Sequence, residues 1–253
     1  MKNTTLAHGL LLLLAAVITP GLTHGESATV AVASNFTAPM NAIATAFERE
    51  TGHRLKISFG SSGKFFAQIV NGAPFHAFLS ADHVKPARLE LEGFTAPGTR
   101  FTYALGTLVL WSAKTDFVDA TGSVLTSQPF GRIALANPKL APYGGAALET
   151  LEHLNIATRL RAKFVMGENI AQTYQFVATG NAELGFVALS QIYEAGQIAR
   201  GSAWIVPSDM HAPIRQDAVL LRRGSDNAAA RALMDYLASA EAAAIIHAYG
   251  YRK

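Results

Sequence analysis

The segment Phe59-Gly60-Ser61-Ser62-Gly63-Lys64 joins a predicted strand to a predicted helix, and junctions of this kind organise the whole chain. Upstream, residues 55–59 alternate between apolar and polar, which is the period of a half-buried strand. Downstream, apolar residues recur at helical spacing over 65–70, and Gly72 follows as a helix stop. Two hydroxyls therefore lie beside the unpaired amides of a helix N-terminus, where the helix dipole favours an anion.

The same segment also fits an ordinary serine N-cap, which needs no ligand. It does not fit other motifs of this type. A P-loop requires Ser or Thr after Gly-Lys, where this chain has Phe65, and a nucleophile elbow requires a glycine two residues to either side of the serine. The anion hypothesis therefore depends on finding a second junction with the same chemistry.

A second junction follows the small, β-branched strand predicted over residues 29–34. Pro39 suits the first turn of the next helix, with Thr37 or Ala38 at its cap. Ser34 and Asn35 then present a hydroxyl and an amide beside free helix amides. Both junctions are polar and uncharged, and both follow a predicted strand.

The N-terminus is typical of a secretory signal peptide. Lys2 precedes an apolar run over residues 10–18 that is too short to span a bilayer, and small residues follow it. We expect cleavage after Gly25. No later segment approaches 18 consecutive apolar residues, so we expect an exported, periplasmic chain with no transmembrane segment once it is mature.

Composition excludes several functional classes. The 253 residues are 50% hydrophobic, enough for one large domain or two modest ones. The net charge is +3, and no basic run is interleaved with aromatics, so no nucleic-acid partner is expected. The chain has no cysteine, and its eight histidines lack metal-ligand spacing. We therefore expect no cofactor and no metal bound directly by side chains.

The order of predicted elements indicates an α/β fold with two lobes. Strand, helix, strand, helix, strand up to residue 80 predicts a parallel sheet, in which ligands bind at the carboxyl ends of strands. The apolar run 101–112 is a natural crossing into a second lobe, and 203–206 is the return. The expected division is residues 1–25 as signal peptide, 26–106 plus 207–253 as lobe 1, and 107–206 as lobe 2.

The second lobe offers donors of the same kind, in the loop around Tyr143 and in the turn Asn169–Ile170. Catalytic chemistry has less support. Asp82 and His83 are adjacent, and adjacent side chains on a strand or helix point apart. No nucleophile, base and orienting residue come together in the sequence, so no catalytic residue is predicted.

Seven sequence blocks, in a fixed order, carry a family resemblance. They are Ala33-Ser34-Asn35-Phe36, Gly60-Ser61-Ser62-Gly63, Gln68-Ile69-Val70-Asn71-Gly72-Ala73-Pro74, Ser80-Ala81-Asp82, Asn137-Pro138, Ala141-Pro142-Tyr143-Gly144 and Leu184-Gly185-Phe186-Val187-Ala188-Leu189. Together they resemble the periplasmic molybdate-binding proteins that feed ABC importers. The resemblance extends from about residue 29 to 251, nearly the whole mature chain.

The resemblance implies a two-lobe type 2 periplasmic binding protein. Each lobe would be a mostly parallel sheet flanked by helices, and the lobes would close over tetrahedral molybdate or tungstate. The implied donors are the hydroxyls of Ser34 and Ser62, together with Asn35, and the backbone amides of Tyr143 and Ile170. Ser61 is added from adjacency alone. The implied partner is the membrane permease of an ABC importer, and the protein would be a monomer and not an enzyme.

Two departures from the family pattern affect the site. Some members have a ligand-binding tyrosine where this chain has Ala188, and Asn35 is a candidate to compensate for the missing hydroxyl. Lys64 places a cation against the positive end of a helix dipole. Its side chain either turns to solvent, which we favour, or draws anions to the cleft.

Some alternatives stay open at this point. Phosphate carries a proton at neutral pH, and none of the five implied positions offers a carboxylate to accept it. Sulfate carries no proton, so only cavity size can reject it, and molybdate and tungstate are too alike to separate. An enzyme on the same fold is the other alternative, although porphobilinogen deaminase, which shares the two-lobe plan, tethers its cofactor through a cysteine that this chain lacks.

Overall fold

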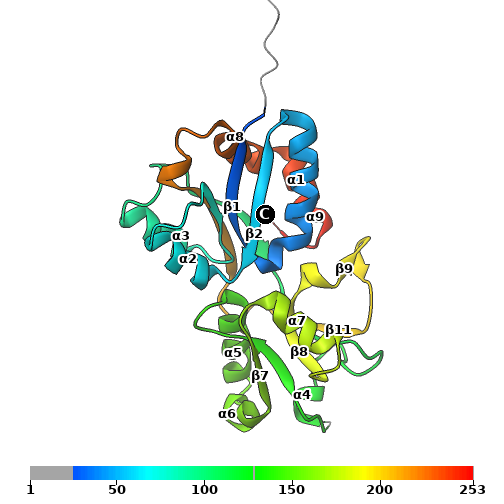
Figure 1. The fold of residues 1–253 in the computed structure, drawn as a ribbon. Coiled ribbons are helices and arrows are strands. Elements are labelled where there is room, and N and C mark those ends of the chain that lie inside the picture. The colour runs from blue at the N-terminus through cyan, green and yellow to red at the C-terminus, as the bar shows by residue number, and fades with distance from the viewer. Residues whose placement is uncertain (1–24, 128, 253) are drawn as a thin grey trace, which may run out of the picture.

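The computed structural model of the chain describes residues 25–127 and 129–252. The expected signal peptide, residues 1–25, lies outside this part except for its last residue, Gly25. The described residues form two lobes, one above the other in Figure 1, and each lobe is built on a five-stranded sheet. Within the described residues, no helix combines the length and apolar character needed to cross a membrane.

Lobe 1 contains a sheet of strand order β2-β1-β3-β12-β4. Its strands are β1 (Ser27–Ala33), β2 (Arg54–Gly60), β3 (Ala77–Leu79), β4 (Phe101–Gly106) and β12 (Ile214–Leu220). One face packs against α1 (Thr37–Thr51), α8 (Ala228–Ala238) and α9 (Ala240–Ala248). The other face packs against α2 (Ser62–Val70) and α3 (Val84–Leu91), which lie together at the left of the upper lobe in Figure 1.

Lobe 2 contains a sheet of strand order β11-β5-β8-β6-β7. Its strands are β5 (Leu108–Ser112), β6 (Ile133–Ala136), β7 (Phe164–Gly167), β8 (Leu184–Ala188) and β11 (Ser202–Ile205). Its helices are α4 (Val124–Ser127), α5 (Pro142–His153), α6 (Ala157–Leu160) and α7 (Ile170–Ala178). The smaller elements of the chain are β9 (Tyr193–Glu194), β10 (Gln197–Ile198), and the 3₁₀ turns η1 (Ser34–Phe36), η2 (Arg161–Lys163), η3 (Leu189–Gln191) and η4 (Arg222–Gly224).

The chain crosses between the two sheets at two places. The apolar run 101–112 divides at Thr107 into β4 of the first sheet and β5 of the second, and residues 206–213 lead back from β11 to β12. Each crossing delivers a strand that runs against the others of its sheet, β5 in lobe 2 and β12 in lobe 1. Both sheets are therefore mixed, with the parallel pairings confined to the βαβ part.

Alternation along the central strands explains why each sheet is covered on both faces. On β1, Val30 and Val32 pack on the side of α1, α8 and α9, whereas Ala31 packs on the side of α2 and α3. Leu110 and Val109 of β5 likewise belong to opposite faces of the second sheet. Strands buried on both faces have little room for polar side chains, and Ser34, Ser61 and Ser62 lie just beyond the ends of β1 and β2.

Candidate functional site

The first junction lies at the carboxyl end of β1. Helical backbone begins directly after the strand, in the 3₁₀ turn η1, and α1 follows at Thr37. The cap expected at Thr37 or Ala38 is therefore wrong, because Ala33 and Phe36 occupy the N-cap positions of η1 and α1. The first amides of a helix lack intrahelical acceptors, so the free amides at this junction include those of Ser34 and Asn35.

The second junction lies at the start of α2. The Ser61 hydroxyl oxygen caps the helix by accepting the Lys64 amide at 3.4 Å. The Ser62 hydroxyl oxygen instead accepts from the Ala81 amide, which lies in the segment between β3 and α3, at 2.9 Å. Both serines are almost fully buried. The N-cap interpretation thus fits Ser61, while the hydroxyl hydrogen of Ser62 stays available for a ligand.

Lobe 2 contributes two further helix N-termini. Ala141 is the N-cap of α5, and Tyr143 is the second residue of that helix. Asn169 caps α7 by accepting the Gln172 amide at 3.0 Å, and Ile170 is the first helical residue. The backbone amides of Tyr143 and Ile170 are therefore among those that have no acceptor within their own helix.

All four junctions meet at one cavity between the lobes. Its volume is about 10 Å³, roughly the room that one water molecule needs. The lining residues, none of which is charged, are Ala33, Ser34, Asn35, Gly60, Ser61, Ser62 and Ala81 from lobe 1 and Ala141, Pro142, Tyr143, Asn169 and Ile170 from lobe 2. Every residue that the sequence analysis proposed for the ligand is in this set.

Contacts between the lobes show that the structure is a closed form. The Gly63 amide donates to the Leu140 carbonyl at 2.8 Å, and the Ala171 amide at the start of α7 lies 3.4 Å from the Ser34 hydroxyl oxygen. A side chain at position 63 would meet the Leu140 backbone, because a Cβ built there lies 2.9 Å from the Leu140 oxygen. The two lobes are therefore in direct contact next to residues that line the cavity.

Asn35 uses its side chain for a different purpose from the one expected. Its side-chain amide nitrogen donates to Gln216 Oε1 and to the Tyr251 hydroxyl, each at 2.8 Å. Both amide hydrogens are thereby used within the protein. The geometry does not support compensation by this side chain for a tyrosine absent at Ala188, and it leaves the Asn35 backbone amide as the donor nearest the cavity.

Lys64 follows neither of the two interpretations made from the sequence. Its side chain is half exposed, and its Nζ lies 2.8 Å from Glu168 Oε2 in lobe 2. Lys64 does not line the cavity. The cation that seemed to oppose the dipole of α2 is instead offset by a carboxylate from the opposite lobe.

Sequence reasoning missed the buried groups behind the cavity. Gln216, Ser190 and Tyr251 are at least 93% buried and contact the predicted site residues through hydrogen bonds. A signal for Gln216 was present, since it is a polar residue within a largely apolar strand. Nothing local marked Tyr251, which lies 216 positions from its partner Asn35.

The tyrosines near the site are neutral. Burial raises the pKa of Tyr143 well above its usual value, and it raises the pKa of Tyr251 to about 12. These hydroxyls therefore keep their hydrogens at physiological pH. An anion in the cavity would meet dipoles and hydrogen-bond donors but no formal charge on the lining side chains.

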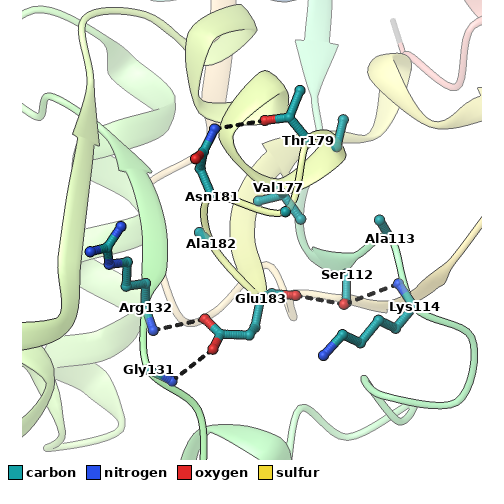
Figure 2. Close-up of a pocket in the computed structure, with 12 residues that line it drawn as sticks. Ser112, Ala113, Lys114, Gly131, Arg132, Val177, Thr179, Asn181, Ala182 and Glu183 are labelled. Atoms are coloured by element: carbon teal, nitrogen blue, oxygen red, sulfur yellow. Dashed lines mark hydrogen bonds between the residues drawn. The ribbon is translucent and has the colours of Figure 1, made fainter.

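A much larger cavity, of about 680 Å³, lies in lobe 2 and contains none of the proposed site residues. Figure 2 shows its lining, which includes Ser112 at the end of β5 and Glu183 directly before β8. Its polar groups mostly satisfy one another: the Glu183 carboxylate accepts the Gly131 and Arg132 amides, and the Ser112 hydroxyl donates to the Glu183 carbonyl. Size alone would favour this cavity, but it does not bring helix N-termini together, and it does not lie between the lobes.

The fold and the site together define a class of protein. Two α/β lobes joined by two crossings, closed over a small polar cavity, are the architecture of a ligand-capturing binding protein. The described residues contain no group of three or more His, Cys, Asp or Glu side chains placed to hold a metal ion.

The chain belongs to the bacterial extracellular solute-binding proteins, because the sequence model of that family matches residues 28–252. The chain is 57% identical over 222 residues to the molybdate-binding protein ModA of Azotobacter vinelandii, covering 88% of each chain. It is 49% identical over 221 residues to ModA of Rhodobacter capsulatus, covering 87% of this chain and 86% of the relative.

A solved structure agrees with these sequence matches. The periplasmic molybdate-binding protein of Azotobacter vinelandii superimposes with a TM-score of 0.87 and 43% sequence identity. The match covers 89% of this chain and 99% of that one. The two-lobe fold expected from the sequence is thereby confirmed as that of the periplasmic binding proteins.

Proposed function

We propose that this protein captures molybdate, or its close analogue tungstate, and delivers it to an ABC importer. The observation that carries the proposal is the cavity between the lobes, where four helix N-termini and two serine hydroxyls meet without any charged lining residue. Such an arrangement suits an anion that carries no proton, because amides and hydroxyls donate and nothing needs to accept. The names of the two ModA relatives support the same ligand.

The proposed donors are the Ser34 and Ser62 hydroxyls and the backbone amides of Asn35, Tyr143 and Ile170. The two hydroxyl oxygens already accept backbone amides, from Ala171 and Ala81. Accepting these bonds orients each serine and leaves its own hydrogen for the ligand. Ser61 is a weaker candidate, because its hydroxyl oxygen serves as the N-cap of α2.

Closure of the two lobes is enough to capture the anion, and no chemical reaction is needed. Donors from lobe 1 and lobe 2 lie on opposite sides of the cavity, so a tetrahedral anion can satisfy both sets only when the lobes are closed. The cavity lining offers no carboxylate, imidazole or thiol that could act as a base or nucleophile. The proposal is therefore a binding protein and not an enzyme, acting as a monomer with the importer's membrane permease as its partner.

The proposed location is the periplasm, reached through a signal peptide cleaved after Gly25. N-terminal sequencing of the protein recovered from a periplasmic extract tests this step. A new N-terminus at Glu26 is the expected result. Recovery with Met1 intact in the cytoplasmic fraction would contradict it.

Calorimetric titration of the mature protein with molybdate, tungstate, sulfate and phosphate tests the ligand. We expect tight binding of the first two and no measurable binding of phosphate, because the lining has no carboxylate to accept the hydrogen of protonated phosphate. Sulfate is the competing candidate, since it too lacks a proton and can be rejected only by size. Binding of sulfate as tight as that of molybdate would overturn the assignment of the ligand.

A further inference from the structure

A buried polar cluster lies directly behind the cavity, on the side of the crossing at Gly106. Six side chains form it, and we refer to them as the interlobe cluster: Asn35, Tyr103, Gln216 and Tyr251 from lobe 1 and Tyr143 and Ser190 from lobe 2. All six are at least 93% buried. Buried polar groups are costly unless they are paired, so a cluster of six in this place requires an explanation.

Gln216 is the centre of the interlobe cluster. Its Oε1 accepts from the Asn35 side-chain amide at 2.8 Å and from the Tyr103 hydroxyl at 3.1 Å, and its Nε2 donates to the Tyr143 hydroxyl at 3.3 Å. The two residues bonded to Oε1 belong to lobe 1, and Tyr143 belongs to lobe 2. The amide side chain of Gln216 therefore connects the two lobes.

The backbone carbonyl of Asn35 is also fixed by hydrogen bonds. This carbonyl accepts from the Ser190 hydroxyl of lobe 2 at 2.8 Å and from the Tyr251 hydroxyl at 2.9 Å. The side chain and carbonyl of Asn35 are thus both fixed by the interlobe cluster. Only the Asn35 backbone amide is left to donate to a ligand in the cavity.

Asn35 and Tyr143 each belong to both the cavity lining and the interlobe cluster. Each lies within the first turn of a helix that lines the cavity, and the polar side-chain atoms of each bond within the interlobe cluster. The position of one proposed donor in lobe 1 is thereby tied, through Gln216, to the position of one in lobe 2. The interlobe cluster fixes how far apart these donors lie when the protein is closed.

The crossing between the lobes leaves room for this connection only because residue 106 is glycine. A Cβ built on Gly106 would lie 2.2 Å from the Tyr143 hydroxyl oxygen and 2.7 Å from Gln216 Nε2. Any side chain at this position would separate the two groups. Gly106→Ala therefore disrupts the connection without removing a hydrogen-bond donor, and the added Cβ meets the Tyr143 hydroxyl rather than its backbone amide.

We propose that Gln216, through its bonds to Asn35 and Tyr143, is a positioning residue that sets the lobe spacing and thereby the size of oxyanion that the closed protein accepts. This inference rests on the function proposed above. The cavity volume is only about 10 Å³, so a small change in spacing alters which tetrahedral anion reaches donors on both sides. A smaller anion such as sulfate bonds poorly when the spacing is fixed for a larger one.

The test compares selectivity in Tyr143→Phe and Gly106→Ala with that of the wild-type protein. Tyr143→Phe removes the hydroxyl bonded to Gln216 and keeps the backbone amide proposed to bind the ligand. Dissociation constants for molybdate and sulfate are measured by competition calorimetry on the mature protein. We expect the ratio of the sulfate constant to the molybdate constant to fall about fivefold, the change expected from the loss of one neutral hydrogen bond.

The control is Tyr174→Phe, which also removes a tyrosine hydroxyl from lobe 2. That ring stacks on Trp111, and its hydroxyl makes no hydrogen bond to another described residue. The selectivity ratio should not change in this variant. Circular dichroism and thermal melting establish that each variant is folded, and Tyr143→Phe, which adds no atoms, keeps the test valid if Gly106→Ala misfolds.

The outcomes distinguish this inference from the proposed function. A lower selectivity ratio in the two cluster variants but not in Tyr174→Phe supports a positioning role. An unchanged ratio would overturn it even if affinity for both anions falls, because that pattern describes a merely structural cluster. A wild-type protein that does not bind molybdate would overturn the proposed function, and this inference with it.

Discussion

Lys64 Nζ lies 2.8 Å from Glu168 Oε2, and this ion pair joins the start of α2 in lobe 1 to the residue before the N-cap of α7 in lobe 2. The adjacent Gly63 amide donates to the Leu140 carbonyl, also across the lobes, at 2.8 Å. Neither contact can persist when the lobes separate. The start of α2 therefore borders the cavity and, through its contacts with lobe 2, stabilises the closed form.

Gly63→Ala should weaken molybdate binding strongly while leaving the protein as stable as before. Alanine favours a helix over glycine by about 1 kcal/mol, so α2 itself should gain. The added Cβ, however, would lie 2.9 Å from the Leu140 oxygen and would oppose closure. Calorimetry and thermal melting on the same preparation measure the two effects.

Gly145→Ala is the matched control for that substitution. Gly145 lies in α5 of lobe 2, and a Cβ built there meets nothing within 4 Å. This variant should bind molybdate as the wild type does. Equal losses of affinity in the two alanine variants would contradict the role given to the contact between Gly63 and Leu140.

Glu168→Gln should speed the release of the ligand modestly. Both members of the ion pair are about half exposed, and pairs of that kind contribute at most roughly 1 kcal/mol, or about fivefold in rate. Stopped-flow measurements at low and high salt provide the dissociation rate. The difference from wild type should shrink as salt increases, because salt screens the pair.

The association rate in the same experiment tests a second consequence. Loss of the carboxylate removes a negative charge from the edge of lobe 2, so anions should associate faster with Glu168→Gln. Lys64→Met should do the reverse. If neither substitution changes association or dissociation at low salt, the ion pair has no part in closure.

Ser62→Ala should reduce affinity by roughly 1.5–3 kcal/mol, the range for a hydrogen bond to a charged group. The Ser62 hydroxyl is almost fully buried, and its oxygen is occupied by the Ala81 amide, which leaves the hydrogen for the ligand. Molybdate titration measures the loss. Unchanged affinity in this variant would remove Ser62 from the site.

Ser61→Ala provides the comparison at the neighbouring position. Because the Ser61 hydroxyl caps α2, its removal should lower the free energy of unfolding by about 1 kcal/mol. The effect on affinity should be much smaller than that of Ser62→Ala. A larger loss of affinity at Ser61 would reverse the assignment of the two serines.

Stability should fall at alkaline pH because of the interlobe cluster. Burial raises the pKa of Tyr251 to about 12 in the folded protein, and the pKa values of Tyr103 and Tyr143 are raised as well. A group whose pKa is raised on folding stabilises the protein fully below its unfolded value, near 10, and loses that contribution as pH rises toward the folded value. Urea unfolding measured from pH 8 to pH 12 tests this sign.

Tyr251→Phe isolates the contribution of one group to that alkaline fall. The variant lacks the titrating hydroxyl, so its stability should decline less steeply above pH 10 than that of the wild type. It should also be less stable at pH 8, because Asn35 loses its two hydrogen bonds to the Tyr251 hydroxyl. Identical slopes in the two proteins would show that Tyr251 does not carry the effect.

Local sequence patterns predicted most of the fold. The alternation before Gly60 and the helical spacing after it placed the junction within a residue of where β2 ends and α2 begins. The long apolar run after residue 100 was interpreted as a crossing, and it supplies one strand to each sheet. These features depend on neighbours a few residues away, which is why they can be found without tertiary information.

The donors at helix starts were also predictable, but their exact use was not. Ser61 and Ser62 are adjacent and chemically identical, yet one caps a helix and the other accepts from the Ala81 amide in the segment after β3. The sequence named Asn35 correctly as a lining residue and assigned it the wrong side-chain role. Which atom faces the cavity depends on what packs behind the residue.

The sequence by itself determined that this chain has two α/β lobes and neutral donors at the strand-to-helix junctions, since periodicity and helix capping are local properties. Only the tertiary structure decided that Lys64 pairs with Glu168, 104 positions away, and that Asn35 bonds to Gln216, 181 positions away. Contacts at such separations exist because two lobes fold and then close on each other. No short-range pattern records which side chains that closure brings together.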